Sequence, residues 1–244
     1  MKYLNQVSTD AECVQQDYNV VYFSDESGKI VIKEKETPIE YEYVDLGLSS
    51  GTKWATCNLG ATTPEGYGQY FQWGETVGHT EDPTSGTTSY TYTWATSPCN
   101  GGNEEYNEEA VAAWDAVHLT NGVLNSDVDA ASVNMGGKWH MPTVRQIQEL
   151  FDNTTNEWVE DYNGTGVNGY KFTNKSDSSK YIFIPASGGC FGSSISSVGE
   201  FGYVFSSSVG SAQYVPILLF NLSGGGVEEN YVRADGTTLR GVIG

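Results

Sequence analysis

The sequence GGKWHMPTVRQIQELFD, residues 136–152, carries the clearest structural signal in the chain. Within this segment, Pro142 is a helix-start signal, and Thr143 with Gln146 three positions later forms a capping-box pattern. These residues predict a helix over 143–152 that follows directly on a short strand. Its apolar stripe recurs at helical spacing through Val144, Ile147, Leu150 and Phe151.

Outward from this segment, the sequence indicates a second helix and many short strands. Residues 104–119 place Ala110, Val111, Trp114 and Val117 on one side of a helix. Residues 78–103, rich in Thr, Ser, Gly and Pro, are interpreted as a long surface insertion. Two helices with a run of strands indicate an α+β fold with short, mainly antiparallel strands. Strands are predicted at 41–46, 52–57, 169–173, 181–185, 202–206, 215–220, 226–232 and 238–242.

The first 40 residues form a separate segment. The β-prone runs 19–23 and 30–33 flank a turn-like cluster, which predicts a β-hairpin. A polar linker follows over 33–38, and we place a domain boundary at residue 40, so that the main domain covers 41–244. Because an isolated two-stranded unit is marginally stable, we expect residues 1–40 to pack on the main domain, to form a homo-oligomer or to bind a larger partner.

Charge and hydropathy argue against several classes of protein. The chain has 244 residues with 12 Lys and Arg against 31 Asp and Glu, a formal net charge of −19. This charge disfavours nucleic acid and anionic membrane surfaces as partners. No apolar run reaches the roughly 18 residues of a spanning helix. The first residues also lack the apolar core of a signal peptide, so either the protein is not exported by that route or an export segment has been removed.

A catalytic set is not apparent in the sequence. His79, His118 and His140 are widely spaced, and we interpret them as a solvated loop residue, a helix-end residue and an architectural residue. Cys190 lies among glycines at 188–192, which is compatible with a nucleophile. A buried thiol is preferred, because no histidine lies nearby in the sequence to act as its base.

Metal binding and disulfides are also weakly indicated. Asp127 and Asp129 could contribute to a calcium site, yet the EF-hand spacing is absent and a polar loop is preferred. We therefore predict no catalytic residue, no metal and no cofactor. Two disulfides are allowed on count alone, but a core of this size does not need them. We therefore favour free, mostly buried thiols at Cys13, Cys57, Cys99 and Cys190.

Two stretches carry a family signature. The first is YVDLGLSSGTKWATCNLGA at 43–61, continued by YGQYFQWGE at 67–75, and the second is GGKWHMPT at 136–143. Both resemble the C-type-lectin-like domains of gut Bacteroidales proteins or their phages, which are related in fold to the formylglycine-generating enzyme. An aromatic-Ser-Ser strand at 201–208 and a closing strand pair within 227–242 extend the resemblance across the main domain.

The chain lacks residues on which the enzyme and lectin branches of this family depend. A formylglycine-generating enzyme needs reactive cysteines in its C-terminal part, where this chain has Cys190 alone. Calcium-dependent lectins carry Glu-Pro-Asn or Gln-Pro-Asp together with Trp-Asn-Asp, and none of these triplets occurs here. Arg233 and Arg240, the only basic residues after residue 180, are expected to bridge strands to carbonyls or carboxylates.

Some proteins of this fold are ligand binders whose C-terminal segment is diversified by a retroelement, and the chain resembles these proteins. The run 215–220 could be a strand that is buried throughout. Strand alternation requires only that half of it be buried, and we prefer to assign the other half to recognition. Framework-like positions are Phe220, Val227, Gly236, Leu239 and Val242. The resemblance implies eleven ligand-binding residues: Tyr203, Phe205, Gln213, Tyr214, Pro216, Leu218, Glu229, Tyr231, Ala234, Asp235 and Thr237.

The sequence therefore predicts a non-catalytic ligand-recognition protein for receptor binding or adhesion, with a retroelement-diversified C-terminal surface. Its ligand would be a protein or glycan on a target cell surface. The protein would be displayed on a phage tail or a cell surface, with residues 1–40 as anchor or oligomerisation segment. The alternatives are an invariant structural or adhesin module and an enzyme of the formylglycine-generating type. Neither nucleic acid nor membrane insertion is expected.

Overall fold

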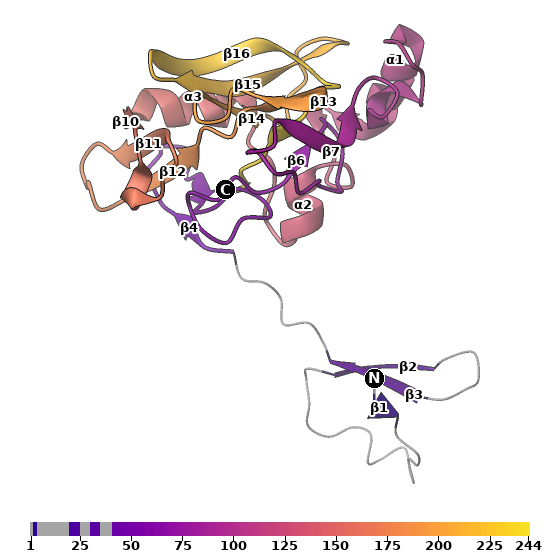
Figure 1. Ribbon diagram of the computed structural model, residues 1–244. Helices are drawn as coiled ribbons and strands as arrows, with labels where there is room; N and C mark the ends of the chain where they lie inside the picture. Colours follow the sequence, from indigo (N-terminus) through magenta and orange to yellow (C-terminus); the bar gives the residue numbers. More distant parts are fainter. Residues whose placement is uncertain (1, 4–19, 25–29, 35–40) are drawn as a thin grey trace. The chain divides into compact units, whose positions relative to one another are not determined.

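The structure is a computed structural model that describes residues 2–3, 20–24, 30–34 and 41–244 (Figure 1). The chain divides into two compact units, Met1–Glu40 and Tyr41–Gly244.

The first unit contains a three-stranded antiparallel sheet. Its strands are β1 (Lys2–Tyr3), β2 (Val20–Ser24) and β3 (Ile30–Glu34), in the order β1-β3-β2. The predicted pairing of the two β-prone runs is confirmed as β2–β3, and β1 is an additional strand. Most of the predicted turn, the linker beyond Glu34 and Cys13 lie outside the described residues.

The second unit is α+β, as predicted, with three helices and mostly antiparallel strands. The helices are α1 (Glu108–His118), α2 (Ala130–Met135) and α3 (Val144–Asn153). The expectation of two helices is corrected by α2, whose six residues are too few to show a helical period in the sequence.

Helix α3 begins where the capping box predicts. The Thr143 hydroxyl accepts a hydrogen bond from the Gln146 backbone N–H at 3.3 Å, and the Gln146 side-chain oxygen accepts one from the Thr143 N–H at 2.8 Å. Ile147 and Leu150 of the predicted stripe are buried. The sequence-based assignment of this helix is confirmed.

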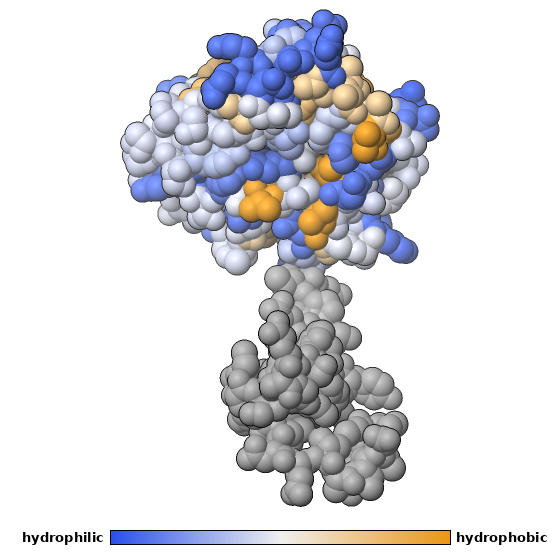
Figure 2. Space-filling model, turned by 90° about the vertical axis from the view of Figure 1, so that its right-hand side faces the viewer, coloured by the Kyte–Doolittle hydropathy of each residue, from blue (hydrophilic) through white to orange (hydrophobic). Residues whose placement is uncertain are grey.

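Helix α1 is shorter than the helix predicted over 104–119. Asn107 is extended and caps the helix, because its side chain accepts a hydrogen bond from the Ala110 N–H at 3.0 Å. Val111 is the buried residue of α1, whereas Val117, expected on the apolar side, is 68% exposed. Figure 2 shows the second unit from the side on which α1 lies. The hydrophobic patches on this face are small and separated by hydrophilic residues.

The largest sheet of the second unit has five strands, and we call it the central sheet; its strands β15 and β16 lie at the top of the unit in Figure 1. Its order is β16-β15-β14-β17-β6, and every neighbouring pair is antiparallel except β14 and β17. Strand β16 is therefore an edge strand. The members are β6 (Tyr70–Phe71), β14 (Phe201–Phe205), β15 (Tyr214–Asn221), β16 (Gly224–Val232) and β17 (Thr237–Thr238).

Four smaller sheets complete the unit. They pair β10-β11-β12, β18-β5-β4, β13-β7 and β8-β9. Two short 3-10 helices span Pro98–Asn100 and Tyr162–Gly164. The strands are β4 (Tyr43–Val44), β5 (Lys53–Ala55), β7 (Thr87–Tyr92), β8 (Leu119–Thr120), β9 (Val123–Leu124), β10 (Thr154–Val159), β11 (Gly169–Asn174), β12 (Tyr181–Pro185), β13 (Gly189–Ser196) and β18 (Val242–Ile243).

The predicted surface insertion over 78–103 lies partly in the interior. It contains β7, which pairs with β13, and both Tyr92 and Cys99 are buried. Glu81, also buried, accepts a hydrogen bond from the Ser89 backbone N–H at 2.6 Å. The polar composition of this segment reflects such internal hydrogen bonds as well as solvation.

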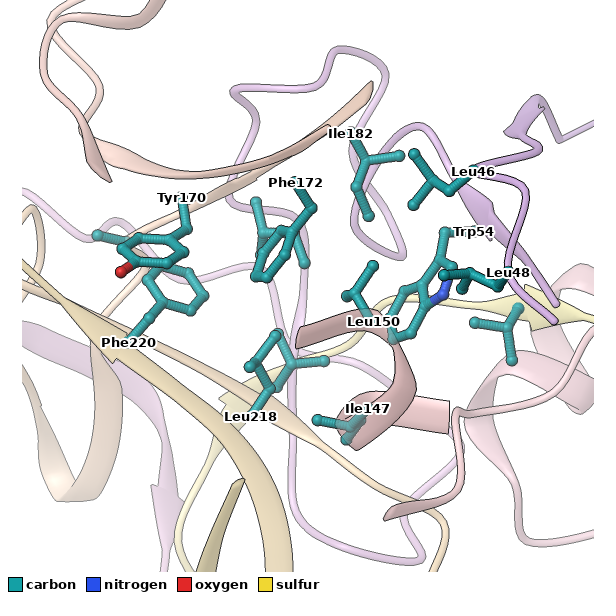
Figure 3. Close-up of a cluster of buried hydrophobic side chains, with 14 residues drawn as sticks. Leu46, Leu48, Trp54, Ile147, Leu150, Tyr170, Phe172, Ile182, Leu218 and Phe220 are labelled. Carbon is teal, nitrogen blue, oxygen red and sulfur yellow. The ribbon is translucent and has the colours of Figure 1, made fainter. Parts of the chain in front are cut away.

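Hydrophobic side chains pack on both faces of the central sheet. Leu218 and Phe220 of β15 belong to a cluster that includes residues of α3 and β11 (Figure 3). Val215 and Ile217 of the same strand belong to a second cluster, which includes Trp73. Since successive strand residues point to opposite faces, β15 contributes to both clusters and is buried almost throughout.

Arg240 is fully buried and bridges strands, as predicted. It donates hydrogen bonds to Asn58 Oδ1 at 2.9 Å and to the carbonyls of Ala55 at 3.0 Å and Phe183 at 2.8 Å. None of these partners is a carboxylate, and burial lowers the Arg240 pKa to about 9. The single strand predicted over 238–242 is two short strands, β17 and β18, which pair with β6 and β5, and Arg240 lies between them.

Candidate ligand-binding surface

The structure divides the eleven predicted ligand-binding residues into a surface group and an interior group. Tyr203, Gln213, Tyr214 and Asp235 are partly buried, and Glu229 is exposed. The assignment of the other six to ligand contact is corrected here, because a side chain in the interior cannot touch a ligand. These six buried residues are Phe205, Pro216, Leu218, Tyr231, Ala234 and Thr237.

Five of the six residues lie in the central sheet, whose two faces are both covered, and Ala234 lies in the turn between β16 and β17. Leu218 belongs to the cluster around α3, and Phe205 and Tyr231 belong to the cluster on the other face. Pro216 lies at an irregularity of the β15–β16 ladder, where its missing N–H is tolerated. Thr237 donates its hydroxyl hydrogen to a carbonyl of β14. The burial of these five residues is a consequence of the sheet's position and not of individual hydrophobicity.

Four aromatic side chains lie in contact along β13, β14 and β16, and we call them the aromatic row: Phe201, Tyr203, Tyr231 and Phe191. Phe201 stacks on Tyr203 with ring centroids 6.0 Å apart and an interplanar angle of 13°. Tyr231 lies 5.4 Å from Tyr203 and 6.4 Å from Phe191. Phe191 is 37% exposed, and Phe201 and Tyr203 are half-buried. The row therefore presents three partly exposed rings, those of Phe191, Phe201 and Tyr203, packed around the buried Tyr231.

Asp235 places an ionisable group close to the aromatic row. Burial raises the pKa of its carboxyl from 3.8 to about 7. The neighbouring Tyr231 has a pKa raised well above its ordinary value, first by burial and then by the charge of Asp235. At neutral pH the Asp235 carboxyl is close to half protonated, so it can offer a ligand either an O–H donor or an anion.

Cys190 lies close to Tyr231, and its thiol is shielded from solvent. The side chain is fully buried, and burial raises its pKa to about 12. A thiol with this pKa forms almost no thiolate at neutral pH, which supports the buried-thiol interpretation over a nucleophile. Cys57 and Cys99 are also free, and Cys99 is buried.

The loop over 210–214 carries Gln213 and Tyr214 on a fixed backbone. The Tyr214 carbonyl accepts a hydrogen bond from the Ser211 N–H at 2.8 Å, and the Gln213 carbonyl accepts one from the Arg233 N–H at 3.1 Å. The buried Arg233 guanidinium binds both carboxylate oxygens of Asp115 in α1, at 2.6 and 3.0 Å. This ion pair confirms the bridging role predicted for Arg233.

Other polar candidates serve the fold. His79, expected to be solvated, is half-buried: its ring stacks on Tyr90 at 3.7 Å, and its Nε2 lies 2.8 Å from Glu75 Oε1. Asp129 caps α2 and accepts a hydrogen bond from the Met141 N–H at 2.9 Å. In the part of the chain that the structure describes, no three His, Cys, Asp or Glu residues are grouped so that they could hold a metal ion.

A groove next to the aromatic row involves residues that sequence reasoning missed. It lies between the end of β10, the turn before β14 and the β15–β16 turn, and it encloses about 330 Å³. Alternation along β14 could have identified Phe201, two residues before Tyr203. The other residues that line the groove come from distant segments of the chain and left no sequence signal. We call this site the hairpin groove, and its main side chains are Trp158, Glu160, Asn168, Glu200, Phe201 and Leu222.

A second hollow, of about 470 Å³, continues from the hairpin groove along β16. The two hollows share Asn221 and Ser223 in the β15–β16 turn. Gly224 and Gly226 have φ values of +144° and +159°, and a Cβ at either position would meet open space. The hollow exists partly because these strand positions carry no side chains.

Comparison with protein families, with curated proteins and with solved structures found no match to this chain. None of the helices that the structure describes is long and apolar enough to cross a membrane.

Proposed function

We propose that the unit Tyr41–Gly244 is a non-catalytic ligand-recognition domain of the C-type-lectin-like class, used for receptor binding or adhesion. The observation that carries the proposal is the aromatic row with Asp235 beside it. Tyrosine and phenylalanine rings offer a large contact area at a low cost in conformational entropy, which suits recognition of proteins and glycans on a cell surface.

The arrangement also supports binding because it is organised before a ligand arrives. Tyr203 and Tyr231 pack on the face of the central sheet that carries the buried Phe205. The backbone of the loop over 210–214 is held by the hydrogen bond from the Arg233 N–H to the Gln213 carbonyl. A surface that does not rearrange loses less conformational entropy on binding. Affinity would come from shape and aromatic contact without a chemical step.

Diversification by a retroelement is part of the proposal, and the core restricts it. Variation at Gln213, Tyr214, Glu229 or Asp235 leaves the buried clusters largely intact. Variation at the six interior positions does not, and variation at Tyr203 removes a ring that packs against the second cluster. Sequencing the DNA beside the gene tests this idea. We expect a reverse-transcriptase gene and a near-copy of the codons for 200–244 that differs at adenines. Absence of both would leave an invariant adhesin as the better description.

Recognition itself is tested by binding of fluorescently labelled full-length protein to intact gut bacteria and to protein and glycan arrays. We expect Phe201→Ala and the double variant Tyr214→Ala/Glu229→Gln to weaken binding about tenfold or more. Val117→Ser, a change at an exposed position of α1, is the control and should bind like the original chain.

Thermal unfolding of each variant accompanies these measurements. Weaker binding with a melting temperature close to that of the original chain assigns the loss to the surface. Recognition through this surface would be wrong if both surface variants bound as tightly as the Val117→Ser control. It would also be wrong if the original chain bound nothing on the cells and arrays.

A further inference from the structure

The hairpin groove has two aromatic walls and an apolar rim. Trp158 of β10 and Phe201 of β14 line it, and Leu222 in the β15–β16 turn is 68% exposed beside them. An exposed leucine at the rim of a hollow is available to cover the apolar part of a bound side chain. The volume of about 330 Å³ suits one or two side chains of a ligand.

The groove is anchored to the core at its aromatic side. The Trp158 ring meets Tyr170 edge-on, with centroids 6.4 Å apart, and Tyr170 stacks on the buried Phe220 at 5.1 Å. Tyr170 itself is buried. The Trp158 ring is therefore positioned by the hydrophobic cluster between the central sheet and α3.

One amide fixes the two loops that carry the acidic residues of the groove. Asn168 donates from Nδ2 to the Gly199 carbonyl at 3.1 Å, and its Oδ1 accepts a hydrogen bond from the Asp161 N–H at 3.1 Å. Gly199 precedes Glu200, and Asp161 follows Glu160. The backbones that present the two carboxylates are thus held in place without a ligand.

The charges of the groove have a single sign. Glu160 and Glu200 are exposed lining residues, and neither lysine nor arginine is among the lining residues that the structure describes. Lys171, on the neighbouring strand β11, instead lies over the Tyr181 ring at 4.4 Å. Two carboxylates without a nearby counter-charge favour a cation, and aromatic faces add cation–π attraction.

We propose that the hairpin groove binds an arginine side chain of a basic segment in a protein ligand. A planar guanidinium can stack on an aromatic ring while it donates to carboxylates, and its aliphatic stem can lie against Leu222. A second copy of this chain is a poor source of such a basic segment, because the chain has 12 Lys and Arg against 31 Asp and Glu. The inference rests on the proposed function, since it assigns the chemistry of the ligand.

The experiment is an NMR titration of the isotopically labelled full-length chain with Nα-acetyl-arginine N-methylamide. The matched probe is the citrulline analogue, which has nearly the same shape and no charge. We expect saturable shifts of the Trp158 indole N–H and of backbone amides at 199–201 and 221–223. The citrulline probe should bind about tenfold more weakly, because charge-assisted hydrogen bonds are lost.

Charge-neutralising variants locate the site. Glu160→Gln and Glu200→Gln should each weaken arginine binding several-fold. Glu157→Gln removes the same charge from β10, but Glu157 lies next to Trp158 in the strand and opposite Lys171 on β11, so its side chain points to the other face. The Glu157→Gln variant should bind arginine like the original chain.

Three outcomes would overturn the inference. They are equal binding of arginine and citrulline, no saturable shift up to about 50 mM probe, and equal losses in all three glutamate variants. If methyl β-D-glucopyranoside shifted these resonances and arginine did not, the groove would bind glycans, and the recognition function would stand. Arginine binding by a chain that binds no cell or array component would instead support the groove and contradict the proposed function.

Discussion

Replacing Asp235 with asparagine is expected to stabilise the protein at neutral and alkaline pH. The carboxyl has an ordinary pKa of 3.8 in the unfolded chain and about 7 in the folded state, because burial disfavours the charged form. Near pH 4 it is protonated in the folded state and close to half protonated in the unfolded chain, so its effect on stability there is below about 1 kcal/mol. Between about pH 4 and pH 7 the unfolded chain releases the proton while the folded chain keeps it, so stability falls as the pH rises.

The magnitude follows from the two pKa values. Each pKa unit corresponds to about 1.4 kcal/mol, so the rise from 3.8 to about 7 lowers the free energy of unfolding by about 4 kcal/mol above pH 7. Asparagine has nearly the same shape and cannot ionise. For a domain of this size, about 4 kcal/mol corresponds to roughly 10 °C in melting temperature.

The assay is thermal and urea unfolding of both proteins from about pH 4 to about pH 9. The free energies of unfolding should agree at the acidic end and diverge through neutral pH, with Asp235→Asn more stable. Glu229→Gln removes one charge at an exposed position and controls for the change in net charge. Parallel curves for the original chain and Asp235→Asn would refute the reasoning, as would a gain in stability equal to that of Glu229→Gln.

Four further perturbations test the fold and the domain boundary. Tyr231→Ala should lower the free energy of unfolding by about 3–5 kcal/mol, because it empties a core position, whereas Tyr214→Ala should change it by less than about 1 kcal/mol in the same urea titration. Arg240→Ala leaves buried acceptors without their donor and should cost about 3–5 kcal/mol by calorimetry. The buried thiol of Cys190, with its pKa raised to about 12, should resist iodoacetamide at neutral pH until urea unfolds the chain, as mass spectrometry would show. Deleting residues 1–40 should change the oligomeric state measured by light scattering while leaving a folded domain, and an unfolded product would contradict the boundary.

Local features of the fold were predictable from the sequence. The capping box at Thr143 and the stripe through Ile147 and Leu150 specify α3 within a few neighbouring residues. The role of Arg240 was predictable for a related reason: an isolated basic residue in a nearly uncharged segment must find acceptors within the fold. Helix α2 was missed because six residues do not complete two turns.

The ligand-binding surface was predictable only in part. Strand alternation assumes one covered face and one open face, but β15 is covered on both, so Leu218 is interior where alternation allowed exposure. The hairpin groove depends on Trp158, Glu200 and Leu222, which are far apart in the chain and meet only through the topology of β10 and the β14–β15–β16 sheet. Contacts of this kind leave no local pattern.

The last strand of the second unit, β18, has a consequence for the synthesis of the protein. β18 pairs with β5, so that Val242 lies opposite Trp54, and Arg240 reaches the carbonyl of Ala55. While residues 240–243 are still inside the ribosomal exit tunnel, Trp54 lacks this strand and part of its burial. The domain therefore completes its core only after these residues have emerged, and such long-range contacts form slowly. A nascent chain that stalls before Arg240 would expose its core and become a substrate for chaperones and proteases.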